Sequence, residues 1–448
     1  MESQIKTYER EDGQLQRVQL VRLEDWHQLE FLPLTYQEGA MECFVKIYEQ
    51  YLVPACPWLF GNMILFRLPE KTFGDFPKSG KYGALADSLT AAAAALQAGV
   101  RFRKGKPVFR NEQLRRFWKE LERQGCVYVV RGKLPVTTVI PVGKLPGFLS
   151  RTAENARLRV NAPFFIMDRF DCATVYDHVG TPLGLRVRDG VVENPPLYQR
   201  EALLVRADGR VSIEQPDVRE LDMVIGGRVY RHGKNAHVYT RPQRAKTPGG
   251  GKTKLVIVGC RVAAVCQGGS VPIPASGFVL EVEDSSTAKP GDGVCYRGME
   301  DVRFGIQVGN SILREGVPTL RFRSRFYNIY HLEPVPFPPS LYPMNFRKAR
   351  AARIALGADR DGRPMLAWAE GAAKQGQIPG QDSTGASLLE MTRICRDLGM
   401  YNAIHLDGGG SAQLLLGGKR SLRISDRTPD GTEAERPVPL ALVVNTNS

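Results

Sequence analysis

Hydrophobic positions follow a helical period in only a few segments of the chain. A run of strong helix formers at 89–98 and a second segment at 111–124 each end at a glycine. A third segment presents an apolar face over 388–398, with Ser383 or Thr384 as the expected cap. These patterns predict two helices near the N-terminus and one near the C-terminus.

Short runs of β-branched residues bounded by breakers dominate the sequence from Cys126 onward. The runs predict strands at 127–130, 136–140, 202–206, 211–214, 254–259, 277–283 and 303–308. Asp-Gly pairs between them are typical of turns. The chain therefore divides into a smaller helix-containing N-terminal region, residues 1–125, and a larger strand-rich region, residues 126–448. The predicted fold class is α+β, with a strand-rich mixed α/β domain in the second region.

Composition adds limits on the partners. The net charge of +14 favours anionic partners such as phosphorylated small molecules. Basic residues are dispersed and lack an aromatic-basic motif, so nucleic acid is an unlikely partner. No apolar run is long enough to span a bilayer, and the polar N-terminus lacks an apolar signal region. The expectation is a cytoplasmic protein with no membrane association; the pattern does not indicate an oligomeric state.

The most informative motif lies where an apolar strand runs into Asp407, then Gly408, Gly409 and Gly410, then Ser411. Consecutive glycines weaken a strand unless another group must approach the backbone closely. A carboxylate followed by bare amides is one way to present an acid and an anion-binding nest to a small ligand. A tight hairpin with a capping Asp is the alternative interpretation.

In this motif and its surroundings the sequence resembles the phosphodiester glycosidase family over roughly residues 126–448. The glycine run, the helix before it with Ser383 at its start, and the strand 353–357 match the family in order. The segment 161–165 resembles the family's early Asn-Gly-Gly-Phe-Phe element. The resemblance implies a phosphodiester glycosidase-like catalytic domain at 126–448, with residues 1–125 as an accessory region of unknown function.

The sequence also departs from the family at the same motifs. Ala162 and Pro163 replace two family glycines, and His405 stands where the family usually has Asn. Ala412 and Gln413 follow Ser411, where the family favours small hydroxyl residues. These departures leave the class of chemistry in place while the substrate remains open.

The resemblance and the chemistry of the side chains together assign the candidate site residues. Asp407 is the expected catalytic carboxylate, His405 on the same strand face is a candidate acid or base, and Glu370 at a strand end is a candidate second carboxylate. A hydrogen-bonded core histidine is the equal alternative for His405. The expected substrate-binding residues are Asn161, Phe165, Arg353 as a phosphate clamp, Ser383, Gly408, Gly409, Gly410 and Ser411.

Three functions follow from these residues. The leading hypothesis is an intracellular hydrolase that cleaves a glycosidic bond to a phosphate or another anionic aglycone, as in a sugar-1-phosphodiester or a nucleotide sugar. The alternatives are a glycosidase acting on a non-phosphorylated polysaccharide and a non-catalytic protein that sequesters a phosphorylated ligand. No cofactor is required, although Asp407 has the oxygen ligands that Mg²⁺ or Ca²⁺ prefers.

Overall fold

The structure is a computed structural model of the 448-residue chain. It describes residues 1–9, 13–34, 37, 112, 115, 146–152, 155–166, 174, 176–177, 180–197, 200–241, 243–283, 287–319, 350–372, 382–428 and 431–445, and the backbone alone of 63–66, 100–103, 106–109, 126–131 and 138–141. The helix predicted at 89–98 lies outside these residues. Of the helix predicted at 111–124, only Glu112 and Arg115 are described, and both are helical.

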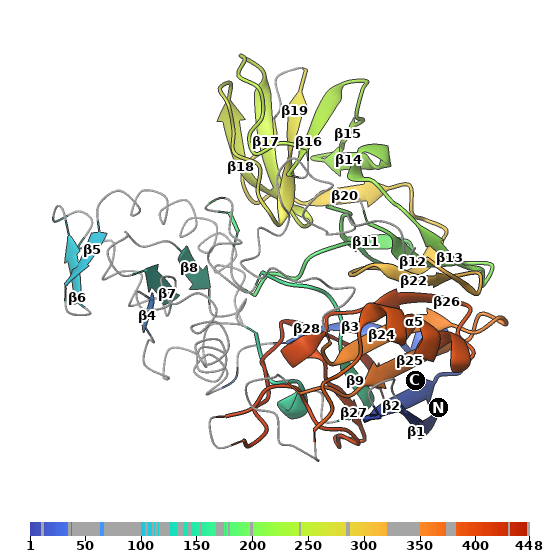
Figure 1. The fold of residues 1–448 in the computed structure, drawn as a ribbon. Coiled ribbons are helices and arrows are strands. Elements are labelled where there is room, and N and C mark those ends of the chain that lie inside the picture. Colours follow the sequence, from blue (N-terminus) through green and yellow to red (C-terminus); the bar gives the residue numbers. More distant parts are fainter. Residues whose placement is uncertain are drawn as a thin grey trace.

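A seven-stranded sheet forms the base of the described part of the chain (Figure 1). Its strands, in spatial order, are β1 (Glu2–Glu9), β2 (Leu15–Arg22), β25 (Pro364–Ala369), β24 (Arg353–Ala358), β26 (Asn402–His405), β22 (Ser311–Arg314) and β23 (Val317–Pro318). All the described pairings in this sheet are antiparallel. The central strands β24, β25 and β26 are buried along their whole length.

The remaining strands form six smaller sheets. A four-stranded sheet contains β27 (Leu414–Leu416), β9 (Ala156–Asn161), β28 (Leu440–Asn445) and β3 (Glu30–Pro33). A five-stranded sheet contains β11 (Val191–Asn194), β10 (Arg186–Arg188), β21 (Val302–Gln307), β12 (Ala202–Arg206) and β13 (Val211–Glu214), and a three-stranded sheet contains β15 (Arg228–Tyr230), β14 (Asp222–Ile225) and β20 (Val294–Arg297). A second four-stranded sheet contains β16 (Ala236–Thr240), β19 (Gly277–Val282), β17 (Thr253–Val258) and β18 (Arg261–Gln267). The last two sheets contain β4 (Met63–Phe66), β7 (Cys126–Arg131) and β8 (Thr138–Pro141), and β5 (Val100–Arg103) with β6 (Lys106–Phe109).

Two apolar clusters cover the two faces of the seven-stranded sheet. Ile354 and Leu406 belong to a core that also contains Leu158 and Leu442 of the β27–β9–β28–β3 sheet. Side chains on the opposite face, such as Ala355, belong to a core shared with the helix α5 (Leu388–Asp397). Because side chains alternate along a strand, Arg353, His405 and Asp407 point to this α5 face.

The helix α5 is the C-terminal helix that the apolar pattern predicts. Its N-cap is Ser387, four residues beyond the first expected cap, and Ser387 forms a capping box with Glu390. The predicted cap was wrong because the chain is still extended at Ala386, which forms a bridge with Ala351, and the Ser383 hydroxyl accepts from the Gly385 amide before the helix begins. The seven predicted strands are confirmed at β7, β8, β12, β13, β17, β19 and β21.

The predicted α+β fold class is wrong. The described residues are mostly in strands of several sheets, and α5 is the one α-helix among them that is described over its whole length. Short 3₁₀ turns lie at Trp26–Gln28, Leu149–Arg151, Val218–Glu220 and Gly409–Ser411. The cause is that most apolar segments bury both of their faces between sheets, which favours strands over amphipathic helices. No helix in the described part of the chain has the length and apolar character to cross a membrane.

The first strands of the chain belong to the same sheets as its C-terminal half. β2 pairs with β25 from Val18 to Arg22, and β3 pairs with β28. These strands come from the region that the sequence assigns to the N-terminal accessory part. The proposed division at residue 125 therefore stays a prediction only for the residues that follow β3.

Candidate active site

Asp407 and Arg353 face each other at the end of the central strand pair. β24 and β26 are antiparallel with Ala355 opposite His405, and the Leu406 amide donates to Ile354 O at 2.9 Å. Continuing this register places Arg353 opposite Asp407. Strand pairing thus brings together two charged groups that are far apart in the sequence.

Burial dominates the electrostatics of Asp407, which is 8% exposed. Loss of hydration raises the pKa of its carboxyl from 3.8 to about 7. The Ser411 hydroxyl, the charge of Arg436, the Gly408 amide and the charge of Arg353 each oppose this rise. Asp407 is consequently an acid that can hold or release its proton near neutral pH.

Arg353 is held rigidly behind this carboxyl. Its guanidinium is 3% exposed, and its Nε donates to Ala386 O, just before α5, at 3.1 Å. Burial lowers the pKa of Arg353 to about 10, while the charge of Asp407 raises it. Because that pKa is still well above neutral, Arg353 brings a positive charge into the site.

His405 lies two residues before Asp407 on the same face and is 2% exposed. Burial, together with the charges of Arg353 and Arg200, lowers its pKa well below the ordinary 6.5. The imidazole is therefore neutral at physiological pH. The sequence suggested His405 as the group that changes charge near neutral pH. That group is instead the carboxyl of Asp407.

The glycine run is a tight turn, and its amides are only partly available. Gly409 to Ser411 form a 3₁₀ turn, and the Gly409 amide donates to Ala352 O at 2.8 Å. A Cβ at Gly410 would lie 2.2 Å from Asp426 Oδ2 and 2.3 Å from Arg436 Nη2, so any other residue would displace this ion pair. The run thus lets the backbone pass close to its neighbours, and the predicted three-amide nest loses at least the Gly409 amide.

Asn161 supports Asp407 through the backbone. Its Nδ2 donates to Asp407 O at 2.8 Å, and its Oδ1 accepts from the Gln413 amide at 3.0 Å. Both ends of the Asn161 side chain are therefore used within the protein. This geometry makes Asn161 a residue that positions the acid.

Glu370 lies in a separate ion-paired cluster. Arg17 donates to both of its carboxylate oxygens, at 2.8 and 2.6 Å, and the Arg423 amide donates to Oε1 at 2.9 Å. A carboxylate held in this way by a bidentate arginine is a structural anchor. Ser383 belongs to the same cluster, because Gln16 also donates to Glu370 O.

Phe165 is a core residue. It is 4% exposed, forms a bridge with Pro182 and belongs to the apolar cluster that includes Leu183 and Leu185. Its ring therefore contributes to packing within that apolar cluster.

Two further arginines, which the sequence analysis did not single out, act on the site. Arg436 pairs with the buried Asp426 at 2.9 Å and lowers the pKa of Asp407. Arg200 is 7% exposed, donates to Val308 O at 3.2 Å and lowers the pKa of His405. Neither stands in a sequence motif; both come from connections outside the strands that carry the acid.

Two buried polar atoms in the segments that flank Asp407, His405 Nε2 and Gln413 Oε1, have no hydrogen-bond partner. A Cβ at Gly408 would lie 3.2 Å from His405 Nε2, which shows how closely the imidazole approaches the glycine run. Buried polar groups are nearly always paired, so such a cluster indicates a place where a ligand or water makes the missing bonds. No group of three or more His, Cys, Asp or Glu side chains in the described ranges is arranged to hold a metal ion.

Part of the chain is similar to known proteins. Residues 267–445 match the phosphodiester glycosidase family. The N-acetylglucosamine-1-phosphodiester alpha-N-acetylglucosaminidase of Mus musculus is 38% identical over 85 residues, which are 19% of this chain and 15% of that protein. The Homo sapiens enzyme is 38% identical over 80 residues, 18% of this chain and 14% of that protein. The predicted family resemblance is confirmed for this segment, which contains Arg353 and Asp407, while the chain matches only a small part of each relative.

Solved structures overlap more loosely. The catalytic domain of the zebrafish N-acetylglucosamine-1-phosphodiester alpha-N-acetylglucosaminidase aligns with a TM-score of 0.41 at 12% identity, over 99% of this chain and 82% of that chain. A hypothetical protein from Synechocystis aligns with a TM-score of 0.39 at 20% identity, over 71% of this chain and 62% of that one.

Proposed function

We propose that this chain hydrolyses the glycosidic bond of a sugar 1-phosphodiester or a nucleotide-sugar-like substrate, with Asp407 as the catalytic acid. The observation that carries the proposal is a buried carboxyl with a pKa of about 7, opposite the buried cation Arg353. Near neutral pH a substantial fraction of this carboxyl is protonated. The family match over residues 267–445 and the names of the two relatives support the substrate class.

The proposed reaction begins with departure of the phosphate. The Asp407 carboxyl donates its proton to the oxygen that bridges the sugar and the phosphorus, and the bond from that oxygen to the anomeric carbon breaks. Arg353 faces the phosphate group and stabilises the charge that develops on it. Arg436, which already acts electrostatically on Asp407, adds a second positive charge.

Neutral His405 is the proposed base. Its Nε2 is buried and has no well-formed hydrogen bond within the protein, and its lowered pKa keeps a lone pair available. His405 removes a proton from water, and the resulting oxygen attacks the anomeric carbon. Glu370 is not assigned this role because its carboxylate is already engaged by Arg17 and Arg423. Opposite pKa shifts on two neighbouring groups are the usual sign of an acid and base pair.

The direct test is turnover of the methyl phosphodiester of N-acetylglucosamine 1-phosphate, followed as release of the free sugar. Asp407→Asn is expected to lower kcat by on the order of 10²- to 10⁴-fold. Asp361→Asn, which changes a 70% exposed carboxylate in the turn after β24, is the matched control and is expected to be fully active. Equal turnover by both variants would overturn the role of Asp407.

Two further readouts separate the alternatives. Hydrolysis of a plain aryl glycoside at the same rate as the phosphodiester would instead identify a glycosidase for uncharged substrates. Binding of the phosphodiester with no product after long incubation would identify a sequestering protein. The anomeric configuration of the released sugar tests His405: inversion is expected from attack by activated water, whereas retention would make Asp407 the nucleophile.

A further inference from the structure

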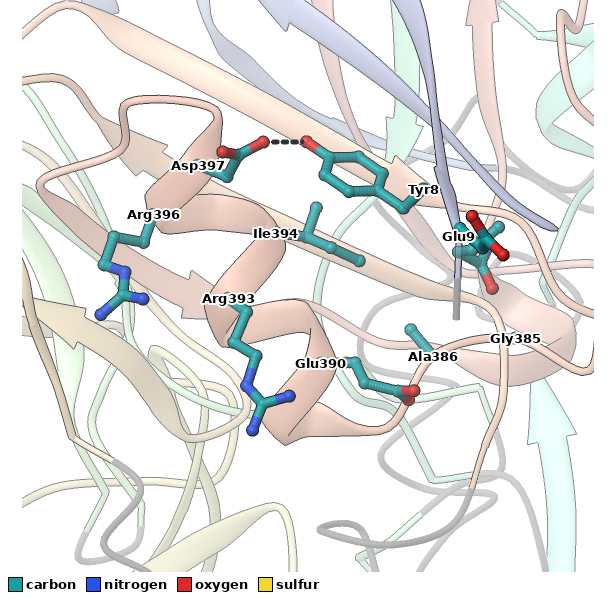
Figure 2. Close-up of a pocket in the computed structure, with 10 residues that line it drawn as sticks. Tyr8, Glu9, Gly385, Ala386, Glu390, Arg393, Ile394, Arg396 and Asp397 are labelled. Carbon is teal, nitrogen blue, oxygen red and sulfur yellow. Dashed lines mark hydrogen bonds between the residues drawn. The ribbon is translucent and has the colours of Figure 1, made fainter. Parts of the chain in front are cut away.

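A cavity that is separate from Asp407 lies between the end of β1 and the helix α5 (Figure 2). Its volume is about 710 Å³, which is within the usual range for small-molecule sites. Tyr8 and Glu9 of β1 form one side, and Glu390 and Ile394 of α5 form the other. None of the residues assigned above to acid, base or phosphate binding lines it.

We propose that this cavity is an accessory site for an uncharged, hydroxyl-rich ligand, a neutral saccharide of about two units. The first argument is charge. The Asp397 carboxylate accepts from the Tyr8 hydroxyl at 2.9 Å, and Glu390 pairs with Arg350 at 2.7 Å. These carboxylates already have partners of their own, so a charged ligand has little to gain from them.

The second argument is the remaining hydrogen-bonding capacity. A carboxylate has about four lone-pair positions, so Asp397, which accepts from Tyr8, can accept further bonds, whereas Glu390 is already engaged by Arg350 and Ser387. Vicinal sugar hydroxyls suit such groups, because they donate hydrogen bonds without bringing a charge that needs compensation. Arg393 and Arg396, whose guanidinium groups extend away from Tyr8 in Figure 2, add donors at the rim.

The third argument is the apolar part of the lining. Gly385, Ala386 and Ile394 offer small or aliphatic surface, and the half-buried ring of Tyr8 stands at the opposite wall. Sugars present apolar C–H faces as well as hydroxyls, so a mixed lining of this kind fits them better than it fits phosphate. Desolvation and the neighbouring Asp397 raise the pKa of Tyr8, so its hydroxyl stays protonated, donates to Asp397 and can accept from a ligand hydroxyl.

The cavity is also connected to the candidate active site through a single backbone segment. Ala386 lines the cavity, and its carbonyl accepts from Arg353 Nε on the other side at 3.1 Å. A Cβ at Gly385 would lie 2.2 Å from Ala351 O, so this segment packs tightly against the start of β24. A ligand that rigidifies the segment would therefore tighten the position of Arg353.

The test of the site uses N,N′-diacetylchitobiose as the probe and saturation-transfer NMR on the full chain. Signal transfer to the disaccharide is expected, with at least a tenfold weaker apparent affinity in Tyr8→Ala. Thr7→Ala, an exposed neighbour on the opposite face of β1, is the matched control and is expected to bind normally. Inorganic phosphate at equal concentration is expected to leave the transfer unchanged.

Each other outcome overturns the proposal. Absence of transfer, or equal transfer in Tyr8→Ala, removes the saccharide from this cavity. Displacement by inorganic phosphate would show an anion site instead. Transfer that survives Tyr8→Ala but is lost in Arg353→Ala would place the disaccharide beside Asp407.

The coupling has its own readout, which rests on the proposed function. Saturating disaccharide is expected to lower KM for the phosphodiester in the wild-type chain and to leave it unchanged in Tyr8→Ala. If the phosphodiester is not turned over at all, the proposed function fails, while the binding experiment still decides the cavity. If turnover occurs and KM does not respond, the coupling fails.

Discussion

A single carboxyl, Asp407, has the property on which the proposed chemistry depends, and that property comes from burial. Loss of hydration raises its pKa to about 7 although Arg353, Arg436 and two hydrogen-bond donors all oppose the change. The same burial, together with the charges of Arg353 and Arg200, lowers the pKa of His405 and keeps its imidazole neutral. Burial of both side chains therefore prepares an acid and a base.

The raised pKa of Asp407 predicts a pH-dependent stability. The folded-state pKa of about 7 is above the ordinary 3.8, so the folded state is favoured while Asp407 is protonated. This contribution to the free energy of unfolding is fully present below pH 4 and is lost as pH rises through 7. The shift of about three units corresponds to roughly 4 kcal/mol at most. Asp407→Asn has no carboxyl to ionise and does not lose this stability. Its free energy of unfolding relative to wild type should therefore increase between pH 5 and pH 8. Urea unfolding at several pH values measures this, and parallel curves for the two proteins would contradict the assignment.

Arg436 offers a second test of the same electrostatics. Its charge lowers the pKa of Asp407, so Arg436→Gln should raise that pKa further. The alkaline limb of kcat/KM should then move to higher pH, because the acid keeps its proton longer. Arg436→Lys keeps the charge and should leave the limb close to its wild-type position.

Thermal unfolding is a necessary control, because Arg436→Gln also leaves the buried Asp426 without its ion-pair partner. A limb that stays in place in a folded Arg436→Gln protein would show that Asp407 is not the titrating acid.

The sequence could reveal Asp407 and Arg353 because each lies within a continuous motif. It could not reveal Arg436 or Arg200, since these reach the site from connections with no periodic pattern. It placed Glu370 at a strand end, but it could not reveal that Arg17, far away in the sequence, engages that carboxylate. Contacts of this kind are set by the tertiary fold, and no local pattern records them.

At the scale of elements, the strands were predictable and the helix cap was not. Apolar β-branched runs between turns identify strands locally, and every one of the seven expected strands is present. The start of α5 depends on where the extended chain ends, and Ala386 is still paired with Ala351 beside β24. The choice of Ser387 therefore depends on pairing with the segment before β24.

The cap of α5 is expected to matter for both stability and substrate binding. Ser387→Ala removes the capping box with Glu390 and should cost about 1 kcal/mol of stability. Because Ala386, the preceding residue, holds Arg353, KM for the phosphodiester should rise as well. Ser387→Thr retains a capping hydroxyl and should behave like wild type. A variant Ser387→Ala with reduced stability and unchanged KM would show that the cap does not position Arg353.

At the scale of the whole molecule, the first 33 residues complete sheets that the C-terminal half cannot complete alone. β2 covers one edge of β25, and its residues Val18, Leu20 and Val21 are almost fully buried. The turn before β3 packs Trp26 against Phe304 of β21, with ring centroids 5.3 Å apart. A chain division based on composition misses this, because strand pairing joins segments regardless of their distance in the sequence.

This integration predicts that residues 126–448 do not fold on their own. Without β2, the strand β25 becomes an edge with unpaired amides and exposed apolar side chains, and Glu370 loses Arg17. The isolated fragment should therefore lack a cooperative thermal transition. A synthetic peptide of residues 1–34 added to it should restore a transition, whereas the same peptide with Leu20→Asp should not, because a charge would enter the core under α5. Cooperative unfolding of the fragment alone, at the midpoint of the full chain, would instead support residues 1–125 as a separate accessory region.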